Sequence, residues 1–482
     1  MANKRKIADI NVSSEIGTLR RVLVHTPDSG LGKVVPSKAQ DWLFEDIVHL
    51  ETIRKEEYDY YTKLLLYFLD GEKIKGRLKI IDDAENNRSF YKPEHIHFYK
   101  SANVVEWQSL LSDILEDDTI KAKLVASVCA IENCSYLIQN DLLQIAPLQL
   151  AKVFITGSLP DKTMIFPPVP NLIFTRDIGI VIKDHILLNK PAKAARIREA
   201  LLTKYIFFNH KLFAGYQHKV IELSDIYQHF LMPESDERRV TLEGGDVMVV
   251  SKNHLLVGVS ERTSMEAAQQ VIKIMFEKKL VEKVSVVKIP LKRDYMHIDT
   301  IFTQVKKDMW VLLSSFSKNA VRHNNADPVQ HILELSDKKN EIHITQFNRR
   351  NINKPVYFDN LEDLLTDISK NDLGCKGNVS FIYSGNNQFP FDVREQWTDS
   401  CNLLALKEGV VLGYDRNNKT AEAFAAHGFS VRGVKEIIND LENGKIQTDD
   451  IQDTLILIPS AELSRARGGF HCMSMPLLRD DI

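Results

Sequence analysis

The chain has 482 residues, 44% of them hydrophobic and 26% charged, which suits one large domain or about two or three ordinary ones. Its 62 Lys and Arg against 65 Asp and Glu leave a net charge of −3, so charge gives no reason to expect nucleic acid or an anionic membrane as partner. No stretch approaches the roughly 20 apolar residues that span a bilayer. The five cysteines are odd in number and thinly spread, which favours a reducing compartment, and we expect the cytoplasm.

The first third of the chain predicts one strand followed mainly by helices. Leu19–His25 is a short apolar run bounded by turn residues, typical of a strand. Helical spacing of apolar residues follows from Asp46 to Leu69. After a charged, irregular stretch at 71–93, residues 101–153 again have helical spacing and no strand signal. The proline-rich run Phe166–Pro170 then reads as a stiff connector.

The rest of the chain alternates short strands with helices. Residues 246–251 and 254–259 predict two strands joined by a tight turn, residues 263–280 an amphipathic helix, and residues 284–291 a strand. This ββαβ order returns at 379–383, 401–406, 409–414, 421–427 and 455–459, whereas 327–360 has no firm assignment. The pattern indicates an α/β fold built from small modules.

The segment Arg467–Pro476 contains a candidate nucleophile, Cys472, among small, turn-forming and cationic residues. Nearby positive charge favours the thiolate over the thiol, and the thiolate is the nucleophile. A lone cysteine is otherwise commonly buried or incidental. Three further segments supply what a thiol needs to attack a cationic carbon: Asn171–Asp177, Leu242–Asp246 and His297–Asp299.

Carboxylates in these segments could hold a planar guanidinium. Asp177 and Asp299 can each accept paired hydrogen bonds from such a cation, although Asp177 could equally form a local ion pair with Arg176. Glu243 precedes two glycines, which permit close backbone approach or simply form a turn. His297 and Asp299 would point to the same side of an extended segment.

An imidazole beside a carboxylate can serve as a general base and hold a cation. The pair His297 and Asp299 could also bind a metal, but no third ligand is suitably spaced. Arg196 and Arg262 each open a predicted helix and could bind the α-carboxylate of an amino acid, or be solvated charges. Together these residues predict a cysteine hydrolase that acts on a guanidinium.

Taken in order, these and other motifs resemble the arginine deiminase family of the guanidine-modifying superfamily. The segments that carry the resemblance run from one end of the chain to the other: Ser14–His25, Leu43–Ile47, Pro170–Asp177, Leu242–Asp246, His297–Gln304, Arg394–Asp399, Gly409–Arg416, Arg465–Gly469 and Cys472–Leu477.

The resemblance implies a role for each candidate residue. Cys472 would be the nucleophile, Asp177 and Asp299 would bind the guanidinium, and Glu243 and His297 would be the acid/base residues. Arg196 and Arg262 would bind the substrate carboxylate, Asn171 and Phe174 would line the pocket, and Arg467 would lie on the loop that gates the thiol. The implied reaction converts free L-arginine to L-citrulline and ammonia through a covalent thiouronium, without metal or organic cofactor.

For the fold, the resemblance implies a fivefold pseudosymmetric α/β propeller of ββαβ units with a helical insertion. We expect residues 1–75 and 161–482 to form this catalytic domain, residues 76–160 to form the insertion, and the protein to be a homo-oligomer. Other guanidine chemistry remains open: a dihydrolase giving ornithine, a dimethylarginine hydrolase or an amidinotransferase. A catalytically silent arginine-binding protein is a further alternative.

The chain also departs from the family pattern. It has apparent extra segments near 71–93, 211–239 and 327–360, and Ser400–Cys401 stands where Gly-Ala is usual. Phe470–His471 replaces the Pro-Arg expected before the cysteine. This last change touches the loop of the nucleophile and leaves rate and substrate preference open.

Overall fold

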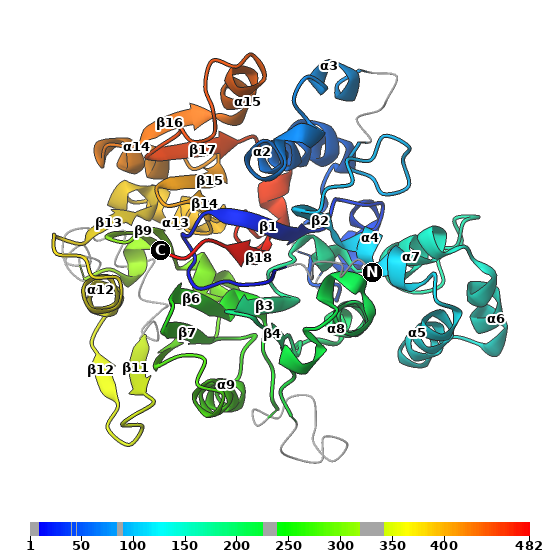
Figure 1. Cartoon of the computed structure of the whole chain (residues 1–482), viewed down its shortest axis with the longest axis horizontal. Coiled ribbons are helices and arrows are strands. Elements are labelled where there is room, and N and C mark those ends of the chain that lie inside the picture. The colour runs from blue at the N-terminus through cyan, green and yellow to red at the C-terminus, as the bar shows by residue number, and fades with distance from the viewer. Residues whose placement is uncertain (1–8, 40, 45, 84–89, 225–238, 319–341) are drawn as a thin grey trace, which may run out of the picture.

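The computed structural model describes residues 9–39, 41–44, 46–83, 90–224, 239–318 and 342–482. The fold is mixed α/β, and its strands form five separate sheets, around which most helices lie toward the outside (Figure 1). Parts of the three apparent extra segments, residues 84–89, 225–238 and 327–341, fall outside the described residues. No helix within the described ranges is long and apolar enough to cross a bilayer.

The five sheets share one pattern of pairing. In each sheet a central strand pairs antiparallel with one neighbour and parallel with another. The sheet orders are β18-β1-β2, β3-β4-β5, β12-β11-β8-β7-β6, β13-β10-β9 and β14-β15-β17-β16. The predicted ββαβ order is therefore present in the described chain, with the final strand β18 returning to pair with the first.

The strand bounds are as follows: β1 Leu19–Val24, β2 Val104–Glu106, β3 Gly179–Ile182, β4 His185–Leu188, β5 Val220–Ile221, β6 Val247–Ser251, β7 His254–Val259, β8 Lys283–Lys288, β9 Phe302–Lys306, β10 Met309–Leu312, β11 His343–Asn348, β12 Val356–Phe358, β13 Ser380–Tyr383, β14 Leu404–Lys407, β15 Val410–Tyr414, β16 Ser430–Gly433, β17 Thr454–Ile458 and β18 Met475–Arg479.

The α-helix bounds are α1 Leu50–Thr52, α2 Tyr58–Leu69, α3 Leu78–Ile81, α4 Trp107–Ile114, α5 Asp118–Ile131, α6 Tyr136–Gln144, α7 Pro147–Thr156, α8 Ile197–Asn209, α9 Met265–Glu277, α12 Leu361–Asp367, α13 Phe391–Trp397, α14 Asn418–Ala426 and α15 Val434–Glu442. One π-helical turn, Ile53–Glu57, joins α1 to α2. The helix predicted from Asp46 to Leu69 is thus confirmed from residue 50 onward, with this interruption.

In the stretch 101–153, the spacing of apolar residues predicted the helices correctly but missed a short strand. Its helices α4 to α7 were predicted, and local chemistry explains their limits: Asp117 and Ser135 cap α5 and α6 by accepting backbone N–H bonds, and Gly157 ends α7 at φ +70°. The absence of a strand was wrong, because β2 pairs parallel with β1. Three residues are too few to display an alternating pattern.

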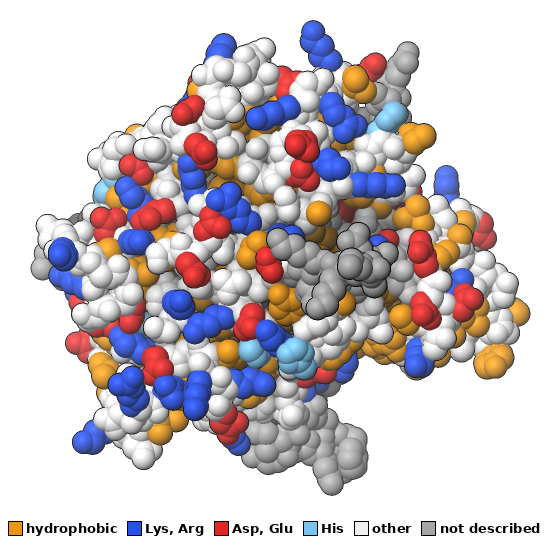
Figure 2. Space-filling view, in the orientation of Figure 1, with side chains coloured by type: hydrophobic (Ala, Val, Ile, Leu, Met, Phe, Trp, Pro, Cys, Tyr) orange, Lys and Arg blue, Asp and Glu red, His pale blue; other side chains and the backbone are white. Residues whose placement is uncertain are grey.

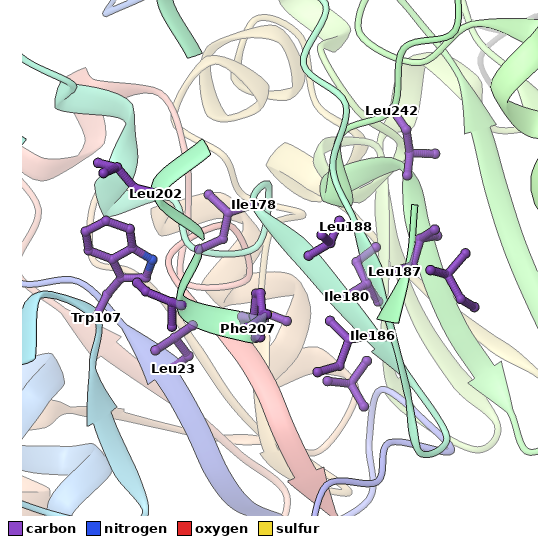
Figure 3. Close-up of a cluster of buried hydrophobic side chains, with 14 of the residues drawn as sticks. Leu23, Trp107, Ile178, Ile180, Ile186, Leu187, Leu188, Leu202, Phe207 and Leu242 are labelled. Atoms are coloured by element: carbon purple, nitrogen blue, oxygen red, sulfur yellow. The ribbon is translucent and has the colours of Figure 1, made fainter. Parts of the chain in front are cut away.

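A continuous apolar core connects these helices to the sheets. Trp107 of α4 and Phe207 of α8 pack with Leu23 of β1 and with residues of β3 and β4 (Figure 3). The surface is different in character, because charges of both signs are interspersed over the face in Figure 2, as expected for a net charge of −3.

Just beyond β1, a buried histidine is paired with two acids. His25 Nδ1 lies 3.0 Å from Glu106 Oε1, and His25 Nε2 lies 2.9 Å from Asp28 Oδ2. Burial alone would lower the pKa of His25, but the hydrogen bonds to Asp28 and Glu106 outweigh it and raise the pKa from 6.5 to about 9. Charged His25 therefore favours the folded state.

We predict that His25→Gln lowers the free energy of unfolding by about 3 kcal/mol near pH 6, because it leaves two buried acids without their cation. The folded-state pKa is the higher one, so this contribution is complete below pH 6.5 and disappears as pH rises through about 9. Urea unfolding at pH 6 and pH 10 measures it. An equal loss at both pH values would contradict the assignment.

Candidate active site

One cavity is lined by all the predicted site residues except Asp299, whose Oδ2 lies 3.6 Å from the thiol of Cys472. The lining residues are Leu43, Asn171, Phe174, Asp177, Arg196, Glu243, Arg262, Met296, His297, Thr300, Ala466, Arg467 and Cys472. They come from segments far apart in sequence, and most follow or precede strands of different sheets. Leu43, Met296, Thr300 and Ala466 were not among the predicted residues.

Glycines allow the site segments to approach one another. A Cβ on Gly244 would overlap the carbonyl of Arg176, and one on Gly245 would lie 2.6 Å from the imidazole of His297. These separations, 2.0 Å for Gly244 and 2.6 Å for Gly245, are shorter than any normal contact of a Cβ atom. Residues 244 and 245 can therefore pack here only as glycines. The two glycines thus approach Arg176 and His297 closely, and residues Gly244–Asp246 also form a turn, so both expected roles occur.

His297 and Asp299 do not form the extended pair that their spacing suggested. His297 is extended, with φ −142° and ψ 161°, but residues Ile298–Thr300 form a single 3-10 turn. His297 consequently faces Glu243 while Asp299 faces Cys472. Alternation applies only within a strand, and this segment lies just before β9.

His297 is held between two acids. Its Nε2 lies 3.1 Å from Glu243 Oε2, and its Nδ1 lies 3.8 Å from Asp177 Oδ1. Burial opposes protonation, but the charge of Asp177 and the hydrogen bond to Glu243 prevail and raise the pKa of His297 to about 10. At neutral pH the side chain is an imidazolium and can donate a proton.

Arg196 occupies the space between the same acids. Its Nη1 donates to Asp177 Oδ2 at 2.8 Å and to Glu243 Oε2 at 3.1 Å, and its Nε donates to Glu199 Oε2 at 2.9 Å. Burial opposes the negative charge of Glu243, but Arg196 and His297 hold its pKa far below the usual range. The Arg196 guanidinium thus contacts one of the acids predicted to bind a substrate guanidinium.

Ligand atoms of Asp177, Glu243 and His297 lie within 4.8 Å of one another, close enough to share a metal ion. Arg196 Nη1, however, donates to both carboxylates of this group. A metal ion there would have to displace that cation, so the geometry as it stands favours organic cations over a metal.

Cys472 is fixed by its neighbours in a strongly acidic environment. Its N–H donates to Asn402 Oδ1 at 2.9 Å, and its Sγ lies 3.6 Å from Asp299 Oδ2. Burial, followed by the charges of Asp299 and Asp177, raises the pKa of the thiol well above its ordinary 9.0. The expectation that flanking cations favour the thiolate was therefore wrong for the free protein.

Asn402 was missed by sequence reasoning although it contacts both sides of the site. Besides Cys472 it bonds Asp299, donating through Nδ2 to the backbone carbonyl at 3.1 Å. No motif marked Asn402 itself, and only its neighbours Ser400–Cys401 were noted as an expected difference from the resembled family.

Three predicted binding residues form the remaining wall. Arg262 is 3% exposed, with Nη1 3.9 Å from Glu243 Oε1. The Asn171 amide donates to the carbonyl of Trp42 at 2.7 Å. Arg467 stacks on Trp397, its Cζ 3.7 Å from the ring centroid, and has a left-handed φ of 59°, a strained value that is rare outside glycine.

Buried acidic oxygens in the site lack donors. Asp177 Oδ1, Glu243 Oε1 and Asp299 Oδ1 have no hydrogen-bond partner among the described residues. A buried acceptor left unpaired costs about 1–3 kcal/mol. The arrangement therefore favours a ligand that is cationic and rich in N–H donors.

We predict that alkylation of Cys472 by iodoacetamide in the free protein is slow at pH 7 and rises about tenfold per pH unit to at least pH 9, because only the thiolate reacts. Peptide mass spectrometry across a pH series measures it. A plateau already reached at pH 7 would contradict the raised pKa.

Comparison with known proteins identifies relatives of this chain. Residues 139–479 match the family model described as arginine deiminase. The chain is 28% identical over 486 residues to the arginine deiminase of Borrelia garinii subsp. bavariensis and 29% identical over 487 residues to that of Oenococcus oeni, each covering 98% of both chains. Among solved structures, an amidinotransferase from Microseira wollei matches with a TM-score of 0.46 at 13% identity over 98% of both chains.

Proposed function

The chain belongs to the arginine deiminase family, and from this premise we propose that it hydrolyses the guanidinium of free L-arginine to L-citrulline and ammonia. The observation that carries the proposal is a buried thiol beside acidic oxygens that have no donor. Asp299 Oδ2 lies 3.6 Å from the sulfur of Cys472, and Asp299 Oδ1 has no partner among the described residues. A guanidinium bound there brings its central carbon to the sulfur.

Binding requires an exchange of one guanidinium for another. The free oxygens of Asp177 and Asp299 accept N–H bonds from the substrate, which fixes its plane. Arg196 then leaves Asp177 and turns, with Arg262, toward the α-carboxylate. Asn171 and Phe174 line the pocket, and Arg467 lies on the loop beside the thiol. Asp177 therefore keeps a cationic partner throughout, and Asp299 gains one when the substrate binds.

The substrate also activates the nucleophile. In the free protein the acids hold Cys472 as a thiol. A guanidinium between Asp177 and Asp299 offsets their charge and lowers the pKa of the thiol, so that its proton is released as the substrate binds.

Two half-reactions follow. The thiolate attacks the central carbon and forms a C–S bond; His297, already protonated, gives its proton to one amino group, and the C–N bond breaks to release ammonia. Water then attacks the remaining thiouronium, and His297 takes up a proton from it. The C–S bond breaks, citrulline leaves, and the hydroxyl proton of the adduct returns to sulfur. Glu243 holds His297 throughout.

We predict that Cys472→Ala abolishes ammonia and citrulline production while arginine binding persists. Cys129→Ala, which removes a buried thiol of α5 outside the cavity, is the matched control and retains turnover. Ammonia and amino-acid analysis also separate the alternatives. Ammonia with ornithine would indicate a dihydrolase, and arginine binding without turnover in the unaltered protein would indicate a silent binding protein.

Arg262→Ala is predicted to weaken arginine binding by about 10- to 100-fold, since one charge-assisted hydrogen-bonded contact contributes roughly 1.5–3 kcal/mol. Binding of agmatine, which lacks the carboxylate, changes much less. Calorimetry on the Cys472→Ala background measures both. Arg432→Ala is the control, because Arg432 of β16 is ion-paired with Glu436 outside the cavity. Equal losses for the two ligands would reject the carboxylate-binding role.

The finer architecture is part of the same proposal. The shared strand pairing supports five blades related by pseudosymmetry, with residues 1–75 and 161–482 as the catalytic domain and 76–160 as a mainly helical insertion. The free state of all five cysteines supports a cytoplasmic location. A homo-oligomer is the expected assembly, which sedimentation of the purified protein measures.

A further inference from the structure

His471, the residue before the nucleophile, lies between two carboxylates. It is 3% exposed; its Nδ1 lies 2.9 Å from Asp299 Oδ2 and its Nε2 lies 3.2 Å from Glu15 Oε2. An ionised carboxylate oxygen only accepts hydrogen bonds, so both contacts are satisfied only if both ring nitrogens carry a proton. In this setting His471 is an imidazolium.

Both carboxylates are ionised. Burial favours the neutral acid in each case, but it is outweighed by Arg176 and His471 at Glu15 and by His471 and His297 at Asp299, so the pKa of each acid lies below its usual value. Besides His471, the charged groups that bear on these two acids are Arg176, His297 and Arg479, and the titratable thiol of Cys472 lies beside Asp299.

The far side of His471 is rigidly held. Glu15 accepts from Arg176 Nη2 at 2.8 Å and from the backbone N–H of Val249 at 3.0 Å. The backbone N–H of Arg176 in turn donates to the carbonyl of Cys472 at 2.9 Å. Because Glu15 is held in this way, its contact with His471 also holds the imidazole in place, and the imidazole in turn holds Asp299.

The hydrogen bond from His471 engages one carboxylate oxygen of Asp299, and the other oxygen stays available to accept from a ligand. Oδ2 is engaged by the imidazolium, whereas Oδ1 is buried without a donor among the described residues. This fixes the carboxylate in the orientation that presents a free acceptor, and it places a positive charge next to the acid that lies closest to the thiol.

We propose that His471 is a positioning residue for the reaction: as an imidazolium between Glu15 and Asp299, it orients Asp299 so that Oδ1 receives the substrate guanidinium, and it offsets the negative charge that Asp299 imposes on Cys472. The inference rests on the proposed function.

The test is a double-mutant cycle of arginine binding on the Cys472→Ala background, measured by calorimetry. His471→Ala and Asp299→Asn each weaken binding by about 10- to 100-fold, the range expected for the loss of one hydrogen bond to a charged group. The two changes together cost no more than Asp299→Asn alone, because His471 acts through Asp299. His471→Arg, which restores a cation with several donors, recovers most of the affinity.

The control is His25→Gln, which alters another buried histidine held by two acids, at a place outside the cavity. It destabilises the fold but leaves arginine binding unchanged. Should His471→Ala fail to fold, His471→Gln, with a side chain closer in size and one donor, takes its place in the same cycle.

A second measurement, the pH dependence of Cys472 alkylation, tests whether His471 offsets the negative charge of Asp299. With Cys472 intact, His471→Gln shifts alkylation of the thiol to higher pH, whereas His471→Arg does not. Additive losses in the cycle, or an equal loss in His25→Gln, would overturn the inference. Absence of both citrulline production by the unaltered protein and arginine binding by Cys472→Ala would instead overturn the proposed function, so the two failures are distinguishable.

Discussion

Negative charge buried beside a thiol is the constraint on which the site depends. Asp177, Glu243 and Asp299 are almost fully buried, and ionised acids can remain there only if cations and donors neutralise them. In the free protein that task falls to Arg196, His297 and His471. The same acids raise the pKa of Cys472 and keep it protonated. The thiol is therefore a poor nucleophile until a further cation binds beside these acids.

This view connects binding with chemistry. In the proposed mechanism a guanidinium both replaces Arg196 at Asp177 and offsets the charge that suppresses the thiolate, so specificity for a cation and activation of the nucleophile have one origin. The raised pKa of His297 fits the first half-reaction, which needs an acid. His471 then has a complementary task, because it holds the second carboxylate without competing for its free oxygen.

The residue types of the site were predictable because most of them lie in short motifs next to the ends of strands, where glycine and turn residues mark the close approach. The ββαβ order was predictable for the same local reason. Three features were not. Arg196 donates to Asp177, Asn402 joins Cys472 to Asp299 from a loop without a distinctive pattern, and the acids around Cys472 are distant from it in sequence. Each depends on tertiary contacts that periodicity does not encode.

The central claim is that the sulfur of Cys472 attacks the guanidinium carbon. Rapid acid quench of the protein during turnover of L-arginine, followed by peptide mass spectrometry, tests it most directly. The account predicts a transient adduct on Cys472 with the mass of arginine less ammonia, which disappears as arginine is exhausted. Steady citrulline production without any such adduct in the pre-steady state, or with the adduct on another residue, would contradict it.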